Sequence, residues 1–307
     1  MILEGTVENY FISICIPTYN RIEDLKQTVE KICSSYGNSK EVEIVICDNG
    51  SIDGTDLYLI ELKERYSNVS IAIKKENMGF DKNFLDCYVL AQGKYVHFLG
   101  DDDKLINIEF ENLIRNIRDT NADVIISNYT IDCTKTHYNA LKNNDTNFNK
   151  LEDLFSYVGH WITFISAITL KKRIIKEERL NEYDGLGFMH IAILLELFAN
   201  HEGIFIYNSI PLVVATDKNK PSYSVLELFG NNLMKIFYMK MGEVNHNHFI
   251  GFFRSIYKFI MTSNINLIQL FNKKIIIYKV SGLKLFLSLD IIITIGKLFI
   301  KKIILGK

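Results

Sequence analysis

The sequence predicts an α/β protein: a Rossmann-like, three-layer, mainly parallel sheet with a C-terminal all-helical extension. Up to about residue 128, short apolar runs of strand length alternate with segments whose apolar residues recur at helical spacing. This β-α alternation is typical of parallel sheets with helices on both faces. From Ser224 onward the pattern is helical only. We therefore expect a sheet-containing domain over residues 1–222 and a helical region over residues 223–307.

Five apolar runs predict the strands of the first half, and polar or turn-forming residues follow most of them. The runs cover residues 11–16, 42–47, 69–73, 95–99 and 124–127. Between them, apolar residues three and four apart predict helices near residues 25–36, 55–66, 80–91 and 106–117. Ligands bind outside the carboxyl ends of the strands in such sheets. The polar residues after the first, second and fourth strands are therefore expected to meet at one edge.

The second half is expected to be less regular. Residues 133–150 are polar and rich in Asn, which indicates a loop or an insertion. Apolar patterns then predict a helix, a strand, a further helix and two short strands. These elements are expected at residues 151–158, 162–170, 189–199, 204–207 and 212–215.

The composition indicates a globular protein with an uneven distribution of charge. Hydrophobic residues make up 48% of the 307 positions, which allows a large core and excludes global disorder. The net charge of −1 gives no reason to expect nucleic-acid binding. From Arg254 to the end, ten Lys and Arg residues accompany a single acid, Asp290. The sequence therefore predicts an acidic body with a basic, apolar tail.

The cysteines and the N-terminus favour a cytoplasmic location. The five cysteines are odd in number and form no Cys-x-x-Cys pair, so a disulfide framework is not expected. Residues 1–10 lack the basic and apolar regions of a secretory signal. Residues 275–305 are rich in Ile and Leu, but charges interrupt them. This favours a helix lying on the anionic inner face of the membrane over a spanning one, with a buried helix pair or homo-oligomer contact as the alternative.

Three consecutive carboxylates, Asp101, Asp102 and Asp103, follow the fourth expected strand after Gly100. Adjacent like charges repel, so they are best tolerated where a cation gathers them. Hard oxygen ligands suit Mg²⁺ or Mn²⁺, with phosphate oxygens completing the coordination shell. The alternative is a solvated, Asp-rich turn.

Other polar groups are expected at the same edge of the sheet. A Pro-Thr-Tyr-Asn segment beginning at Pro17 closes the first strand, and Asp48 closes the second. An Asn-x-Gly pair, Asn77 and Gly79, precedes the third helix, where Lys82 could meet a diphosphate. Taken singly, these residues read as turn or surface residues. Together they suggest a nucleotide site.

In order along the chain, these segments resemble family 2 glycosyltransferases of the GT-A fold. The motifs are ICIPTYNR at 14–21, IVICDNGSIDGT at 44–55, NMG at 77–79 and LGDDD at 99–103. The final motif is most similar to the abequosyltransferase-like branch of bacterial surface-polysaccharide enzymes. The resemblance covers residues 11–105 with ordered spacing, becomes loose through about residue 222, and does not extend to the tail.

The resemblance implies an inverting transferase that moves a sugar from a nucleoside-diphosphate sugar, most simply a UDP-sugar, to a saccharide acceptor carried on a lipid. It implies Mn²⁺ or Mg²⁺ held by Asp103 and Asp101 on the leaving diphosphate. Gly100 stands where the commonest form of the motif has its first Asp, which leaves the individual contacts open. The implied donor-binding residues are Pro17, Thr18, Tyr19, Arg21, Asp48, Asn49, Asn77, Gly79, Lys82, Asp101 and Asp102.

Inversion also needs a general base for the acceptor hydroxyl. The family has a Glu-Asp pair at the start of a helix in the acceptor half, and here the matching residues are Met189 and His190. An imidazole can serve as base near neutral pH. His190 is therefore the first candidate and Asp184 the second, while a core histidine is the alternative for His190.

Two other functions remain open from the sequence. A nucleotidyltransferase also uses a Rossmann-like sheet and a carboxylate-bound metal, although residues 17–21 contain no glycine for a phosphate loop. A sugar-nucleotide-binding or scaffold subunit without catalysis would explain the missing Glu-Asp pair.

Overall fold

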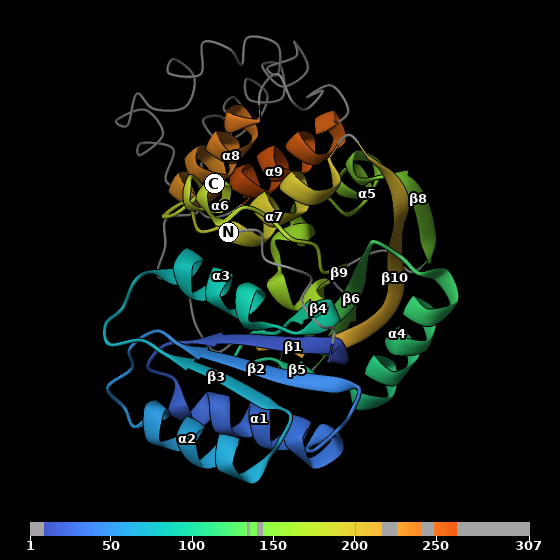
Figure 1. The fold of residues 1–307 in the computed structure, drawn as a ribbon. Coiled ribbons are helices and arrows are strands. Elements are labelled where there is room, and N and C mark those ends of the chain that lie inside the picture. Colours follow the sequence, from blue (N-terminus) through green and yellow to red (C-terminus); the bar gives the residue numbers. More distant parts are fainter. Residues whose placement is uncertain are drawn as a thin grey trace.

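The computed structural model describes residues 9–133, 136–139, 144–199, 201–216, 226–240 and 249–262. Within these residues one sheet of ten strands forms the centre of the molecule (Figure 1). Its main path runs β3-β2-β1-β4-β9-β6-β10-β5, while β7 pairs with β6 and β8 with β10. The pairs β1–β2, β1–β4, β2–β3 and β6–β10 are parallel. The pairs β4–β9, β6–β9, β6–β7, β8–β10 and β5–β10 are antiparallel. The predicted α/β fold is therefore confirmed, but the sheet is mixed, with its parallel strands mainly in the first half of the chain.

The first half of the chain follows the predicted alternation. Its elements are β1 (Tyr10–Thr18), α1 (Ile22–Tyr36), β2 (Val42–Asp48), α2 (Thr55–Arg65), β3 (Val69–Ile73), α3 (Phe80–Leu90), β4 (Gly93–Phe98), α4 (Asn107–Thr120) and β6 (Val124–Cys133). Helices α1 and α2 cover one face of the sheet and α3 the other (Figure 1). Strand β2 is buried along its whole length, as a parallel strand between helical layers must be.

The polar stretch predicted as a loop is partly strand. Strands β7 (Thr136–Asn139) and β8 (Thr146–Lys150) lie there, paired with β6 and β10. The side chains of β8 are exposed or only half-buried. A strand at the margin of a sheet needs no apolar run, so composition gave no sign of it.

Two other expectations need correction. The predicted strand at 162–170 is two 3₁₀ turns, Gly159–Thr163 and Ile165–Ala167, followed by the short antiparallel strand β9 (Ile168–Lys171). Short apolar runs do not distinguish buried turns from strands. The two strands predicted near 204–215 are one, β10 (Glu202–Ala215), with register shifts around Pro211, which has no N–H to donate. The two-residue strand β5 (Lys104–Leu105) was not predicted.

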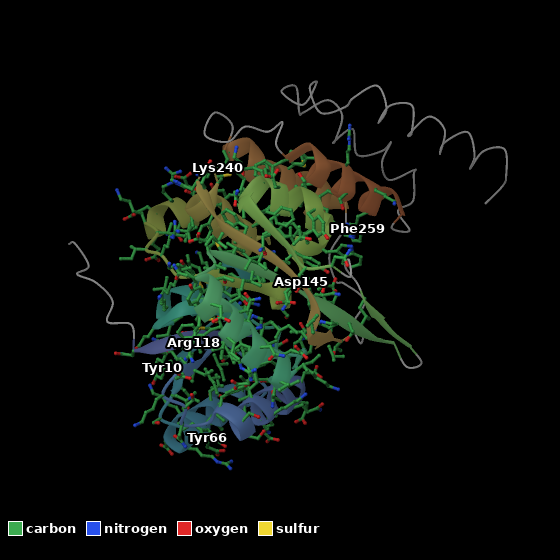
Figure 2. All side chains as sticks on the ribbon, turned by 90° about the vertical axis from the view of Figure 1, so that its right-hand side faces the viewer. Tyr10, Tyr66, Arg118, Asp145, Lys240 and Phe259 are labelled. Carbon is green, nitrogen blue, oxygen red and sulfur yellow. The ribbon has the colours of Figure 1, made fainter. Side chains whose placement is uncertain are left out.

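Helices of the second half gather at the end of the molecule opposite α2. They are α5 (Leu151–Val158), α6 (Glu177–Asn181), α7 (Met189–Phe198), a π-helical segment (Leu226–Asn232), α8 (Leu233–Met239) and α9 (Ile250–Thr262). In Figure 2, Lys240 and Phe259 mark this end and Tyr66 the other. The Phe155 ring meets Phe237 and Phe252 edge to face, which packs α5 against α8 and α9.

No helix within the described part of the chain is both long and apolar enough to cross a membrane. The predicted interfacial helix at 275–305 lies outside the described residues, as does most of the basic tail. The helical character expected from residue 223 onward is therefore seen only for residues 226–240 and 249–262.

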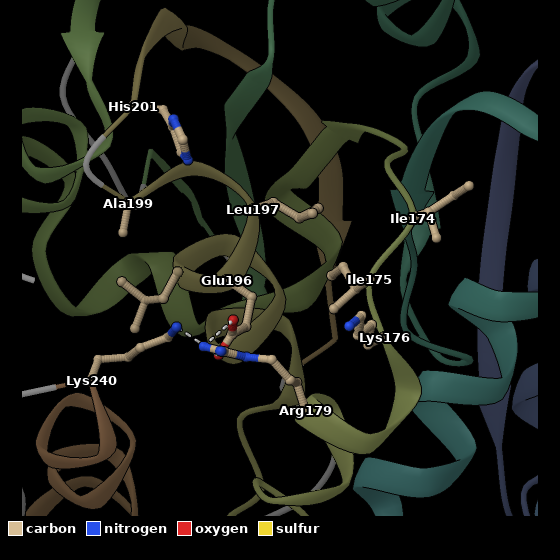
Figure 3. Close-up of a pocket in the computed structure, with 10 residues that line it drawn as sticks. Ile174, Ile175, Lys176, Arg179, Glu196, Leu197, Ala199, His201 and Lys240 are labelled. Atoms are coloured by element: carbon tan, nitrogen blue, oxygen red, sulfur yellow. Dashed lines mark hydrogen bonds and ion pairs between the residues drawn. The ribbon is translucent and has the colours of Figure 1, made fainter. Parts of the chain in front are cut away.

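A buried ion pair ties α8 to α7. Glu196 lies between Arg179 and Lys240 in the wall of a small cavity of about 410 Å³ (Figure 3). Its carboxylate is 2.8 Å from Lys240 Nζ and 3.1 Å from Arg179 Nη2, and it accepts a 2.6 Å hydrogen bond from the Tyr183 hydroxyl. Only 7% of the Glu196 side chain and 5% of the Lys240 side chain are exposed.

We expect Glu196→Leu to lower the free energy of unfolding by about 3–5 kcal/mol, because it leaves the Lys240 ammonium buried beside an apolar side chain. The double variant Glu196→Leu/Lys240→Met should recover most of that loss. As a control, Arg118→Gln removes an exposed ion pair with Glu41 and the contact of its guanidinium with the Phe11 ring, and should cost only about 1–2 kcal/mol. Urea unfolding of the four proteins tests this, and a double variant no more stable than the single one would contradict it.

Candidate active site

A cleft of about 1220 Å³ opens at the carboxyl ends of β1, β2, β4 and β10. This is the edge at which the sequence predicted a site. Most of the residues singled out from the sequence line it. They are Pro17, Thr18, Tyr19, Arg21, Asn49, Asn77, Gly79, Asp101, Asp102 and Asp103.

Asn49 joins the loops that form one wall of the cleft. Its amide nitrogen donates to Asn77 Oδ1 at 2.9 Å and to the Gly79 carbonyl at 3.1 Å, and its Oδ1 accepts from the backbone N–H of Met78 at 2.9 Å. Gly79 has a φ of 91°, which favours glycine at this turn into α3. The Asn residues of the motifs thus shape the wall, while the exposed ring of Tyr19 offers a flat apolar face in the cleft.

The three carboxylates have different surroundings. Asp101 pairs with Arg21 at 2.8 Å and accepts a 2.8 Å hydrogen bond from the Thr18 hydroxyl. Asp102 is more exposed, at 18% of its side chain, and lies 3.2 Å from the same Arg21 nitrogen. Asp103 is 5% exposed and accepts hydrogen bonds from the Ser166 hydroxyl and from the backbone N–H of Thr216.

Asp103 is held by residues from two other parts of the chain. Ser166, in the 3₁₀ turn before β9, donates to the carboxylate and accepts from the backbone N–H of Gly100 at 2.8 Å. The hydroxyl of Thr216, just past β10, donates to the Asp102 carbonyl at 2.7 Å. A Cβ on Gly100 would lie 2.7 Å from Asp103 Oδ2 and 3.4 Å from Ser166 Oγ. A residue larger than glycine at position 100 would therefore require the side chains of Asp103 or Ser166 to shift.

The electrostatics of the cleft favour a cation. Burial raises the pKa of Asp103 to about 6, and the charges of Asp102 and Asp101 add to this, while the Ser166 hydrogen bond opposes it. Burial also raises the pKa of Asp101, and Arg21 opposes that rise. A raised carboxyl pKa means that the anionic form is poorly compensated. Additional positive charge in the cleft would stabilise it.

The donor set fits a divalent cation that is shared with a ligand. Among the described residues, no three His, Cys, Asp or Glu side chains converge as a ready-made metal cage. Mg²⁺ is commonly bound through one or two carboxylates, with phosphate oxygens and waters supplying the rest. Adjacent carboxylates at the floor of an open cleft match that pattern.

Two predicted donor-binding residues do not line the cleft. Asp48 is fully buried, and its carboxylate accepts from the N–H and the hydroxyl of Ser51, closing the turn after β2. Burial raises the pKa of Asp48. Lys82 forms a 3.5 Å ion pair with Asp184 outside the cleft wall. In this structure Asp48 shapes the turn that presents Asn49, and Lys82 pairs with an acid. The direct donor contacts expected of both residues remain predictions that their positions do not favour.

The position of His190 does not favour the first choice of general base. His190 is 2% exposed, and its ring packs between those of Phe84 and Phe188. Neither ring nitrogen has a hydrogen-bond partner of good geometry. Burial lowers the pKa of His190 to about 3, and the Thr163 backbone opposes this shift. His190 is a core residue here. Its apolar helix neighbours were the sign of this in the sequence.

The start of α7 is held by Asp81 instead. This buried carboxylate accepts from the backbone N–H of Gly187 at 2.6 Å and of Met189 at 3.1 Å. It thereby satisfies donors at the N-terminus of α7 from the first turn of α3. Asp184, the second candidate base, is about one-third exposed at the side chain but does not line the cleft.

Several lining residues were missed in the sequence. They are Ile22, Glu23, Asp24, Phe80, Asn83, Phe164, Ile165 and Thr216. Thr216 carried a usable signal, since it is the polar residue directly after an apolar strand, as in the other motifs. Phe164 and Ile165 could not be found in this way because they belong to a segment misread as a strand.

Known proteins are similar to this chain in sequence and in fold. Residues 13–179, more than half of the chain, match the family described as Glycosyl transferase family 2. The chain is 28% identical over 225 residues to abequosyltransferase RfbV of Salmonella typhimurium, covering 68% of this chain and 67% of that protein.

Solved structures of S. aureus TarS show the same fold. TarS 1–349 matches with a TM-score of 0.65 and 16% identity, covering 85% of this chain and 77% of that one. Its complex with UDP-GlcNAc matches with a TM-score of 0.64 and 14% identity, over the same shares of the two chains.

Proposed function

The chain belongs to glycosyl transferase family 2, and from this we propose that it moves a sugar from a UDP-sugar to a saccharide acceptor in the synthesis of a bacterial surface polysaccharide. The observation that carries the proposal is the cleft at the carboxyl edge of the sheet. It brings an aromatic ring, a wall of Asn side chains and three carboxylates together in one space large enough for a nucleotide-sugar.

The residues of the cleft have separable roles in this proposal. Tyr19 and the wall built by Asn49 and Asn77 receive the nucleoside. Asp101, Asp102 and Asp103 face the diphosphate, and they are the residues that would hold Mn²⁺ or Mg²⁺. When bound, that ion neutralises charge on the leaving diphosphate. A similar solved structure, that of TarS, was obtained with UDP-GlcNAc, which supports a UDP-sugar as the donor.

The reaction forms a bond from the acceptor oxygen to the anomeric carbon and breaks the bond from that carbon to the diphosphate oxygen. UDP leaves, and the configuration at the anomeric carbon inverts. The acceptor hydroxyl loses its proton to a base, for which the burial of His190 leaves Asp184 as the remaining candidate from the sequence. Contact of Asp184 with an acceptor would require its ion pair with Lys82 to open.

A second function has one observation in its favour. Neither His190 nor Asp184 lines the cleft, which is what a sugar-nucleotide-binding subunit without catalysis would show. We rank it below transfer, because the three carboxylates proposed to face the diphosphate all line the cleft.

Free nucleotide release from a panel of nucleotide-sugars, with saccharide acceptors and with Mn²⁺ or EDTA, tests these functions. Acceptor-dependent release of UDP supports transfer, and its loss in EDTA supports the metal. Binding of UDP-sugars without release would favour the binding subunit. Pyrophosphate release from a nucleoside triphosphate and a sugar phosphate would favour a nucleotidyltransferase instead.

We also propose that the chain acts on a lipid-linked acceptor at the inner face of the cytoplasmic membrane, peripherally bound through the basic tail beyond Arg254. Sedimentation with anionic and neutral vesicles at low salt tests this. The protein should sediment with anionic vesicles and not with neutral ones. Sedimentation with both kinds of vesicle, or with neither, would overturn the electrostatic attachment. A homo-oligomer contact would then be the alternative for the tail.

A further inference from the structure

Arg21 has an unusual position among the charges of the cleft. Of the described residues that line it, Arg21 is the only Lys or Arg, whereas six of the lining residues are acids. These acids are Glu23, Asp24, Asp53, Asp101, Asp102 and Asp103. The guanidinium therefore provides the positive charge within the cleft wall, where carboxyl groups are otherwise poorly compensated.

The contacts of Arg21 are those of a bridging cation. One nitrogen, Nη1, lies 2.8 Å from Asp101 Oδ1 and 3.2 Å from Asp102 Oδ2. The remaining oxygen of Asp101 is engaged by the Thr18 hydroxyl. A divalent cation bound to these carboxylates would need the same oxygens at closer range.

The side chain of Arg21 is free enough to leave. It is 35% exposed, in contrast to 7% for Asp101, and Arg21 stands just before α1, where its backbone is not part of the helix. Because its backbone lies outside the carboxylate cluster, this long side chain can swing away from Asp101 and Asp102 without moving the strands. The carboxylate of Asp101 is held by the Thr18 hydroxyl, and that of Asp103 by Ser166 and Thr216.

We propose that Arg21 is the resident counter-cation of the carboxylates in the donor-free protein, and that it competes with the divalent cation for Asp101 and Asp102. This deepens the proposed function and rests on its metal assignment. It has a direct consequence for the order of binding. The donor-free protein holds the metal weakly, and the metal gains its site when the diphosphate supplies further oxygens and an anionic partner for the displaced guanidinium.

Mn²⁺ binding, measured by the electron paramagnetic resonance of free Mn²⁺, tests the competition without turnover. Wild type, Arg21→Gln, Arg21→Lys and Arg118→Gln are titrated with and without UDP. Arg118→Gln is the matched control, since it removes the same charge from an exposed pair outside the cleft. Thermal unfolding confirms that each variant is folded.

Without UDP, Arg21→Gln should bind Mn²⁺ at least about 10-fold more tightly than wild type, and Arg118→Gln should match wild type. With UDP present, the difference in Mn²⁺ affinity between Arg21→Gln and wild type should become smaller. Arg21→Lys keeps the charge and should stay closer to wild type than Arg21→Gln. Equal or weaker Mn²⁺ binding by Arg21→Gln overturns the proposal, and weaker binding would make Arg21 a residue that merely positions Asp101. If no protein binds Mn²⁺ even with UDP, the metal assignment fails and this inference with it, whereas transfer is judged separately by nucleotide release in EDTA.

Discussion

Asp103→Asn is expected to reduce sugar transfer by about 10²–10³-fold or more and, at the same time, to make the donor-free protein more stable at neutral pH. The loss of activity follows from removing one preorganised charge beside the leaving diphosphate. The gain in stability follows from removing a poorly compensated buried carboxylate. Lower activity together with higher stability is what we expect when a residue serves function at a cost in stability.

The sign of the pH effect comes from the raised pKa of Asp103. Its folded value of about 6 exceeds the ordinary value of 3.8, so the folded state binds this proton more tightly than the unfolded state does. Stability therefore falls as pH rises from about 4 to about 6, and the penalty is complete above that window. A shift of this size corresponds to at most about 3 kcal/mol. The neutral Asn side chain avoids that penalty at every pH.

Unfolding in EDTA at pH 4 and at pH 7.5 measures this effect. Asp103→Asn should exceed wild type in stability at pH 7.5 and approach it at pH 4. Asp119→Asn, on the exposed surface of α4, is the matched control and should change little at either pH. An Asn variant less stable than wild type at pH 7.5 would mean that the hydrogen bonds from Ser166 and Thr216 outweigh the burial of charge. Full transfer by Asp103→Asn would remove Asp103 from the metal site.

The parallel half of the fold was predictable because its constraints are local. Buried strands such as β2 must be apolar throughout, and the helices between them must be amphipathic, as in α1, whose buried residues include Leu25, Val29 and Ile32. The antiparallel strands carry no such signature. Strand β9 is four residues long between β4 and β6, and its role depends on neighbours far away in sequence.

The site was predictable to a similar degree, and for a related reason. Residues directly after parallel strands must reach the carboxyl edge, so Thr18, Asn49 and Asp101 were placed from the sequence alone. The direction in which each side chain points could not be predicted from the sequence. Asp48 and Asn49 are neighbours in the chain, yet Asp48 turns into the loop and Asn49 lines the cleft. A motif fixes which residues arrive at an edge, whereas packing decides which of them face a ligand.

His190 shows the same limit, and it leads to the second large expected effect. His190→Ala should lower the free energy of unfolding by about 2–5 kcal/mol, because it leaves a cavity beside Phe84 and Phe188. The turnover of the folded fraction should stay within a few-fold of wild type. His190→Leu should retain more stability than His190→Ala, because it fills the space and removes two buried ring nitrogens without good partners.

The pH dependence separates a core histidine from a base. Burial lowers the folded pKa of His190 to about 3, below its ordinary value of 6.5, so the unfolded state binds this proton more tightly. The residue therefore costs stability progressively as pH falls from about 6.5 to about 3, and His190→Leu should remove that part of the acid sensitivity. Urea unfolding of wild type and His190→Leu at pH 5 and at pH 7.5 measures the difference.

Turnover measurements also distinguish a core histidine from a general base. Asp184→Asn is the parallel variant, and we expect it to reduce turnover by about 10²–10⁴-fold with little change in donor affinity, as the loss of a general base does. His190→Leu should leave the acidic limb of the pH–rate profile where it is in wild type. A folded His190→Leu that loses turnover by the same factor, together with that limb, would return His190 to the role of base. In that case the α7 helix would have to open in the acceptor complex to expose an imidazole that packing now encloses.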